Sequence, residues 1–294
     1  MPAALEPDIR YQVVSSGRLV LCLTFRRRKM CVEVTRGYLR TRWGQIHYQA
    51  AGRTGPVVVL FHESPLSSWI FERALPLLGR KLRAFAFDTP GYGHSEPPEH
   101  PLEIEAYAER LLAAVDGLGV DSFAVAGTHT GASIAVEVAA QAGKTRITHA
   151  VLSGVLLLTP EERERFLSSW APDLPLDEHG RHLDWAWKRY KESFGPDAPL
   201  ELVNGAAISI TANHDKYNWG YKAAFRYDPE PALRRLSCPV LFLTPEGDIL
   251  AEADRTAAEF MAQADLHIIP SLQGQLPWRA PDLYASELES FILN

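Results

Sequence analysis

The stretch Val125-Ala126-Gly127-Thr128-His129-Thr130-Gly131-Ala132-Ser133 decides the fold. An apolar run at residues 123–126 leads into a Gly-x-x-x-Gly turn, and a helical pattern of small residues follows at residues 132–143. Strand, tight turn and helix in this order are typical of the nucleophile elbow, G-x-S-x-G, which raises its central side chain above the sheet. The central residue here is His129, where that motif has a serine.

Predicted strands and helices alternate along most of the chain. Apolar runs predict strands at residues 19–25, 56–61, 83–87, 149–152, 239–243 and 266–269, and a hairpin at residues 31–40 and 45–50. Helical spacing of apolar residues predicts helices at residues 69–78, 104–118, 130–143, 253–261 and 282–293. Because this alternation is typical of βαβ units, we predict an α/β fold with a mostly parallel sheet of eight strands and helices on both faces.

One segment interrupts the alternation. Residues 158–235 are rich in proline, charged and aromatic residues and predict several short helices. A helical insertion between two halves of one α/β domain is expected to form a lid over the carboxyl ends of the strands, where such sheets bind ligands. We therefore divide the chain into an N-terminal extension (1–30), a first part of the core (31–157), a helical lid (158–235) and a second part of the core (236–294).

Composition narrows the class of protein. Of the 294 residues 46% are apolar, which is enough for a sizeable core, and the formal net charge of −6 gives no reason to expect nucleic acid or a membrane as partner. The three cysteines lack metal-ligand spacing, and the chain shows neither a signal-peptide pattern nor an apolar run long enough to span a bilayer. We predict a cytoplasmic protein, a monomer or homodimer, that acts on a small-molecule substrate without cofactor or metal.

Several motifs resemble those of the α/β-hydrolase superfamily, in particular its capped branch with the haloalkane dehalogenases and epoxide hydrolases. His62-Glu63-Ser64-Pro65 is similar to the family's H-G-x-P loop, and residues 88–95, DTPGYGHS, are similar to its D-x-P-G-x-G-x-S loop. Asp248 stands at the position of the triad acid, and Gln275 stands at the position of the triad histidine. The resemblance covers about residues 32–294 and implies the α/β-hydrolase fold with a helical lid.

The chain departs from the family at the reacting groups. His129 replaces the nucleophilic serine, Gln275 replaces the general base, and Glu63 adds a carboxylate near the oxyanion loop. A Ser–His relay therefore has neither its nucleophile nor its base. We predict instead that the imidazole of His129 reaches Asp248 and forms a dyad, in which Asp248 fixes the tautomer and His129 acts as general base.

Further residues are expected around the substrate. The resemblance places the backbone N–H groups of Ser64 and Thr130 at an oxyanion hole, and Gln275 and Glu63 at the border of the same pocket. His62 is grouped with these residues, as a scaffold of the oxyanion loop rather than as a base. Three lid aromatics are expected to wall the pocket: Trp185, Tyr217 and Trp219.

Two classes of function follow from this site. A general base beside an oxyanion hole can hydrolyse an ester, lactone or epoxide, or it can abstract a proton next to a carbonyl, as a lyase, isomerase or cyclase does. The resemblance favours a hydrolase by analogy. The alternative is a catalytically silent protein that binds a small molecule in the same lidded pocket. A side chain that titrates near neutral pH at the elbow favours an enzyme.

Overall fold

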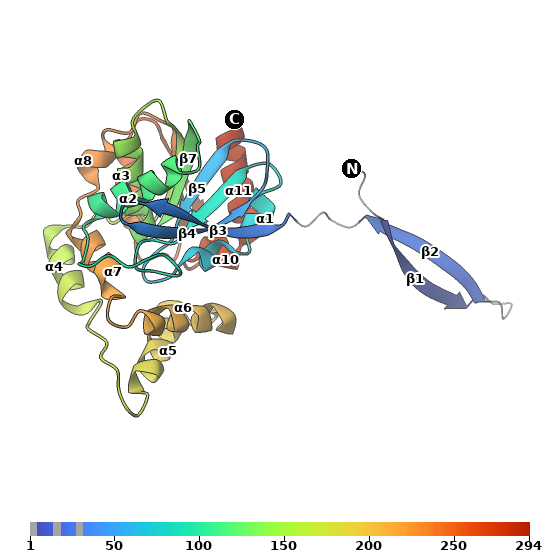
Figure 1. Ribbon diagram of the computed structural model, residues 1–294, viewed down its shortest axis with the longest axis horizontal. Helices are drawn as coiled ribbons and strands as arrows, with labels where there is room; N and C mark the ends of the chain where they lie inside the picture. The colour runs from blue at the N-terminus through green and yellow to red at the C-terminus, as the bar shows by residue number, and fades with distance from the viewer. Residues whose placement is uncertain (1–4, 14–18, 28–31) are drawn as a thin grey trace. The chain divides into compact units, whose positions relative to one another are not determined.

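The computed structural model describes the chain at residues 5–13, 19–27 and 32–294, and it divides the chain into two compact units, Met1–Glu33 and Val34–Asn294 (Figure 1). In the first unit β1 (Leu5–Val13) pairs with β2 (Leu19–Arg27) in antiparallel fashion. The strand predicted at residues 19–25 is therefore present. Its partner β1 was not predicted, because residues 5–13 mix charged residues and proline with apolar ones.

The second unit is built on one eight-stranded sheet, with the spatial order β10-β9-β8-β7-β5-β6-β4-β3. The strands are β3 (Val34–Thr41), β4 (Gly44–Ala51), β5 (Val57–Phe61), β6 (Arg83–Phe87), β7 (Phe123–Thr128), β8 (Ile147–Ser153), β9 (Val240–Pro245) and β10 (Ala264–Ile269). Only β4 pairs antiparallel with its neighbours, so the predicted mostly parallel sheet is confirmed. The central strands β5 and β7 are buried along their whole length, as strands covered on both faces must be.

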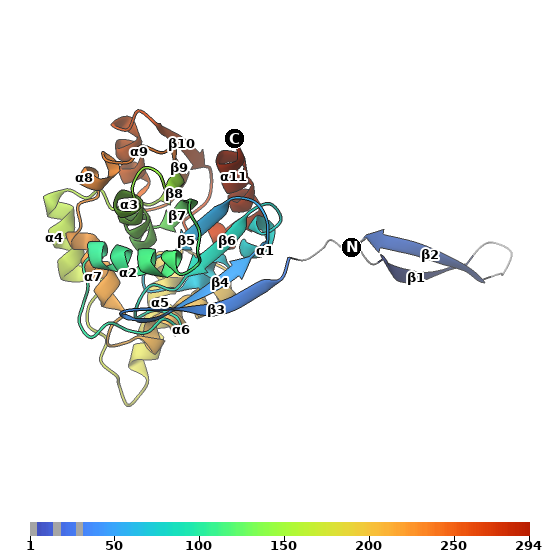
Figure 2. The same ribbon diagram turned by 45° about the horizontal axis from the view of Figure 1, so that its top comes forward.

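Helices cover both faces of this sheet. On one face α2 (Ile104–Asp116) packs on α3 (Thr130–Ala142), which lies against β5, β7 and β8. On the other face α1 (Leu75–Leu78) packs against α11 (Pro281–Leu293), as Figure 2 shows. The remaining helices outside the insertion are η1 (Ser68–Phe71), α9 (Ala251–Glu259) and α10 (Leu276–Arg279). The α/β-hydrolase fold predicted from the sequence is thus the fold of this unit.

One predicted helix is broken in the structure. The spacing at residues 69–78 predicts a single helix, but the chain forms the 3₁₀ turn η1 and, after a short turn, the separate helix α1. Pro76 accounts for the break, because its ring would clash with the carbonyl of Glu72 in a continuous helix. Proline is instead accommodated in the first turn of α1.

The insertion between β8 and β9 contains five helices: α4 (Pro160–Ser169), α5 (Arg181–Ser193), α6 (Leu200–Ala212), α7 (Asn218–Arg226) and α8 (Glu230–Leu233). The helices α5 and α6 pack against each other, whereas α7 and α8 lie on α3 and contribute Ala223, Phe225 and Leu233 to the main core. The insertion is therefore tied to the sheet through its C-terminal part.

Candidate active site

His129 lies at the sharp turn between β7 and α3. Its backbone has φ 48° and ψ −116°, a conformation that costs a non-glycine residue energy and that recurs at functional sites. The two flanking glycines permit the turn, because a Cβ atom at Gly127 would lie 2.1 Å from Gly131 O and one at Gly131 would lie 2.1 Å from Phe61 O. The elbow predicted from the sequence is therefore formed, with an imidazole at its tip.

The imidazole contacts the carboxylate that the sequence predicts for it. His129 Nε2 lies 2.8 Å from Asp248 Oδ2, although 119 residues separate the two. Asp248 follows β9, and its other oxygen accepts a hydrogen bond of 2.9 Å from the Leu250 N–H. The Asp248 side chain is 3% exposed and that of His129 is 23% exposed. The Asp248 side chain is thus shielded from solvent, while part of the His129 ring is accessible.

A second carboxylate faces the other ring nitrogen. Glu63, in the loop after β5, places Oε2 3.6 Å from His129 Nδ1 and is 7% exposed. Gln275 Nε2 donates a long hydrogen bond of 3.4 Å to Glu63 Oε1. The imidazole therefore lies between two buried carboxylates that come from opposite parts of the sequence.

This arrangement fixes the charge of the site. Burial alone would favour the neutral ring, but the carboxylates of Asp248 and Glu63 outweigh it and raise the pKa of His129 to about 10. Burial raises the pKa of Glu63 above its usual range, whereas His129 opposes this rise. For Asp248 burial is outweighed by His129, and its pKa is lowered. At neutral pH His129 is therefore an imidazolium, which donates protons and cannot accept one.

Two residues that the sequence analysis missed hold the ring in place. A Cβ atom at Gly154 would lie 2.3 Å from His129 Cδ2, so only glycine leaves room for the imidazole. Asp254 is fully buried and accepts hydrogen bonds from the N–H groups of Gly154 (2.7 Å) and Val155 (2.8 Å) and from Thr244 Oγ1 (2.6 Å). The position of Gly154 directly after an apolar strand is a usable sequence signal, but nothing in the sequence marks Asp254.

These groups form the floor of a cavity of about 340 Å³, a size that suits a small organic ligand. Ser64 and Thr130 line it, and within residues 32–294 neither backbone N–H donates a hydrogen bond. Glu63 and Gln275 also line it. The two N–H groups are thus available to an oxygen atom of a ligand, as an oxyanion hole requires.

The aromatic wall of the cavity differs from the one expected. Trp185, Tyr217 and Trp219 do not line it. Trp185 packs edge-on against Tyr217, whose hydroxyl donates to the Pro172 carbonyl, and these rings form the core of the insertion itself. The expectation for all three was wrong because α5 and α7 present other residues to the cavity. The aromatic residues that line it are Phe166, Trp170, Tyr190, Phe194, Tyr221 and Phe225.

His62 lies outside the cavity as well. Its Nε2 accepts a hydrogen bond of 2.9 Å from the Thr89 N–H, so the ring carries its proton on Nδ1 and donates it to the Glu63 carbonyl at 2.9 Å. Burial lowers the pKa of His62, which agrees with a neutral ring. His62 therefore supports the loop that carries Glu63 and Ser64, and grouping it with substrate-binding residues was wrong.

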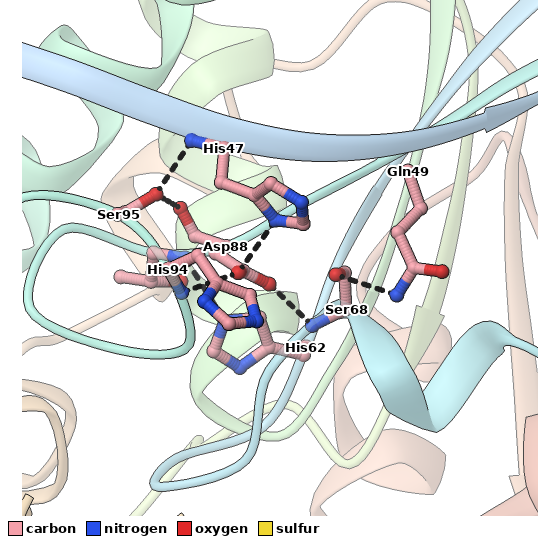
Figure 3. Close-up of polar contacts among 8 residues, drawn as sticks. His47, Gln49, His62, Ser68, Asp88, His94 and Ser95 are labelled. Carbon is pink, nitrogen blue, oxygen red and sulfur yellow. Dashed lines mark hydrogen bonds and ion pairs between the residues drawn. The ribbon is translucent and has the colours of Figure 1, made fainter. Parts of the chain in front are cut away.

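A second histidine–aspartate pair anchors the same loop (Figure 3). His47 Nδ1 lies 2.8 Å from Asp88 Oδ2, and the Asp88 carboxylate also accepts hydrogen bonds from the N–H groups of Ser68 (2.7 Å) and His94 (2.8 Å). Ser95 Oγ donates to the Asp88 carbonyl at 2.7 Å. This network joins β4 and the loop after β6 to Ser68, at the end of the loop after β5.

Within the described part of the chain, no group of three or more histidine, cysteine, aspartate or glutamate side chains is arranged to hold a metal ion. No helix of that part is long and apolar enough to cross a membrane.

Comparison with known proteins agrees with the fold. A family model described as alpha/beta hydrolase fold matches residues 56–198. Haloalkane dehalogenase 2 of Mycobacterium tuberculosis is 33% identical over 107 residues, or 34% of this chain and 37% of that protein. The 2-(acetamidomethylene)succinate hydrolase of Mesorhizobium japonicum is 22% identical over 261 residues, or 81% of this chain and 88% of that protein. The chain spans only about a third of the length of the curated relatives that are at least 30% identical to it.

Solved structures match over most of the chain. The crystal structure of a hydrolase from Pseudomonas aeruginosa PA01 has a TM-score of 0.73 at 18% identity and covers 97% of this chain and 98% of that one. At such identity the match shows the fold alone. The chain thus has the α/β-hydrolase fold, and a family model of that fold and several curated hydrolases match parts of it.

Proposed function

We propose that this protein is a cofactor-independent hydrolase in which Glu63, His129 and Asp248 take the place of a Ser-His-Asp triad. Its substrate is a small ester, lactone or epoxide. The observation that carries the proposal is the ring of His129 between two carboxylates, on the floor of a cavity beside two N–H groups that have no hydrogen-bond partner within residues 32–294. The relatives named haloalkane dehalogenase and soluble epoxide hydrolase support a hydrolytic reaction.

The roles of the residues follow from their charge. The general-base role expected for His129 needs a neutral ring, but its two carboxylate neighbours keep the ring protonated at neutral pH. We therefore assign the base to Glu63, whose carboxylate lies 3.6 Å from the ring and lines the cavity. Asp248 holds Nε2, and Nδ1, which lies 3.6 Å from Glu63 Oε2 and so makes no short hydrogen bond to it, can donate towards the substrate. His129 is the proton donor in this proposal.

For an ester, the proposed reaction needs only water as second reactant. A water molecule gives a proton to Glu63 as its oxygen bonds to the carbonyl carbon. The negative charge that develops on the carbonyl oxygen is stabilised by the N–H groups of Ser64 and Thr130. When the tetrahedral intermediate collapses, His129 protonates the leaving alkoxide, and the proton on Glu63 then returns to His129. For an epoxide, water gives a proton to Glu63 as its oxygen bonds to a ring carbon, the C–O bond of the ring breaks, and His129 protonates the released ring oxygen; the proton on Glu63 then returns to His129.

Isosteric substitutions test this proposal on a panel of p-nitrophenyl esters, lactones and styrene oxide. Glu63→Gln removes the base and His129→Gln removes the donor, while both keep size and hydrogen bonding. Each should lower kcat by about 10²–10⁴, the usual contribution of general acid–base catalysis. Glu164→Gln, on the exposed face of α4, is the matched control and should leave kcat unchanged.

The pH profile separates this proposal from the general-base alternative. With His129 as donor, activity should fall as the pH rises through about 10, because the neutral ring has no proton to give. A His129 base would give the opposite sign, with activity rising through the pKa of the ring. A wild-type protein that turns over none of the compounds, or a Glu63→Gln protein as active as wild type, would contradict the proposal and favour a silent binding protein.

A further inference from the structure

The part of the cavity that the insertion supplies contains an arginine without a partner charge. Arg189, on α5, lines the cavity, and within residues 32–294 no carboxylate lies within 4.0 Å of its guanidinium. One of its five N–H groups donates to the Trp170 carbonyl at 2.7 Å. The guanidinium also lies 5.3 Å from the ring centres of Trp170 and Trp185. It is therefore held by neutral groups, the Tyr221 hydroxyl among them, and within residues 32–294 no carboxylate pairs with its donors.

A buried phenol accompanies this charge. Tyr190, the next residue of α5, is 3% exposed and lines the cavity, and its hydroxyl has no well-formed hydrogen bond within the described residues. Burial raises its pKa well above the usual value, so the group is a neutral donor. Tyr221 of α7 lies beside both residues in the same wall. Tyr221 is the neighbour of this hydroxyl, and a buried hydroxyl that lacks a well-formed hydrogen bond costs free energy that a bound ligand can recover.

The floor of the cavity has the opposite character. Two acidic side chains, Glu63 and Asp248, flank one basic ring there. An anionic group of a ligand is therefore repelled at the floor and attracted by Arg189. Between the two ends the wall is largely apolar, with Leu156, Phe166 and Phe225 among its residues. The cavity thus fits a molecule with an anion at one end, a hydrocarbon or aromatic middle, and a reacting group at the other end.

We propose that Arg189, Tyr190 and Tyr221 form a carboxylate-binding subsite, and that the substrate of this protein carries a free carboxylate in addition to the ester, lactone or epoxide that is cleaved. A guanidinium pairs with a carboxylate through two parallel hydrogen bonds, and a phenol adds a third donor. The statement about the substrate rests on the proposed hydrolysis, whereas the subsite itself does not.

Binding of a matched acid and amide tests the subsite without any turnover. The probes are 4-phenylbutanoate and 4-phenylbutanamide, which differ only in charge and in one heavy atom, and the measurement is calorimetric titration of the full-length protein at neutral pH. The acid should bind wild type about 10- to 100-fold more tightly than the amide, the range for hydrogen bonds to a charged group. Equal affinities, or no binding of the acid, would overturn the proposal and need no variant for that conclusion.

Two variants and a control assign the effect to the residues. Arg189→Gln should bring the two dissociation constants within about threefold of each other without weakening the amide, and Tyr190→Phe should weaken the acid about two- to tenfold. Arg165→Gln removes the same charge from an exposed site on α4 that does not line the cavity, and it should behave as wild type. A preference for the acid that survives in Arg189→Gln would refute the subsite. A preference lost with Arg189, in a protein that hydrolyses nothing, would uphold the subsite and refute only the proposed hydrolysis.

Discussion

Residues 32–294 contain two histidine–aspartate pairs whose N···O distances are equal but whose surroundings differ. In both His47–Asp88 and His129–Asp248 a ring nitrogen lies 2.8 Å from a carboxylate oxygen. The side chains of the first pair are 3% and 1% exposed, whereas the ring of His129 is 23% exposed, towards the cavity. The distance between histidine and aspartate therefore says nothing about which pair can meet a substrate.

The difference lies in what surrounds each pair. The Asp88 carboxylate is saturated by His47 and two backbone N–H groups, and hydrogen bonds outweigh its burial and lower its pKa (Figure 3). The ring of His129 instead faces a second carboxylate, Glu63, in a cavity lined also by Ser64 and Thr130, whose backbone N–H groups have no hydrogen-bond partner within residues 32–294. A sealed and saturated pair stabilises a loop, and an open pair with unused donors can bind and react. Three predictions test this difference between the two pairs.

The largest expected effect is on stability and belongs to the sealed pair. Asp88→Ala leaves His47 and two N–H groups buried without an acceptor, so the free energy of unfolding should fall by about 3–5 kcal/mol. Asp248→Ala should cost less than half of that, because it relieves the repulsion between Asp248 and Glu63 and leaves His129 with one carboxylate. Urea denaturation of the two variants beside wild type measures this. Equal losses would show that the two pairs are structurally equivalent.

The second prediction concerns the pH dependence of stability at the open pair. The pKa of His129 is raised in the folded protein to about 10, from about 6.5 in an unfolded chain. Its contribution to stability is thus complete below pH 6.5 and is lost as the pH rises through 10, by up to about 1.4 kcal/mol per pH unit.

Denaturation of wild type and His129→Gln at several pH values between 6 and 10 tests this sign. The difference in unfolding free energy between the two proteins should shrink steadily towards high pH. His179→Gln, an exposed substitution on the insertion, is the control and should show a constant difference. A wild-type advantage that grows with pH would mean that the ring is neutral in the folded protein.

The smallest effect tests the geometry of the open pair. Gly154→Ala puts a Cβ atom 2.3 Å from His129 Cδ2, so the ring must move away from Asp248. Activity on the best substrate of the panel should fall about 100-fold, as is usual when a catalytic group is displaced by about 1 Å. Gly143→Ala is the matched control: its φ of 82° gives similar backbone strain, but no atom lies within 4 Å of the new Cβ. Equal losses in kcat would trace the effect to strain rather than to the ring.

Local sequence patterns predict most of the fold. The apolar runs of β5, β7 and β9 and the glycines of the elbow predict the parallel sheet, because each pattern reflects burial on both faces or close backbone approach. The predicted sheet and elbow also place His129 above the sheet and in reach of Asp248. These patterns do not predict a break within a helix, and the break at Pro76 between η1 and α1 was missed for that reason.

The chemistry of the site was less predictable than its position. The charge of His129 depends on Asp248 first and on Glu63 in addition, and the distance from Nδ1 to the Glu63 carboxylate comes from loop packing that no sequence pattern records. The prediction of the aromatic residues in the cavity wall failed for a similar reason. The insertion has many aromatic residues, and only the docking of α5 decides that Tyr190 lines the cavity while Trp185 does not.

The wide separation of the site residues in the sequence has a consequence for how the protein is made. Glu63 and Gln275 are 212 residues apart, and His129 precedes its acid by 119. Contacts of such long range form late in folding, because large loops must close before they gain any stabilisation. A nascent chain that ends before β9 has the elbow but not Asp248. The proposed activity therefore requires the last strands of the sheet, and it should return more slowly on refolding than helical structure does.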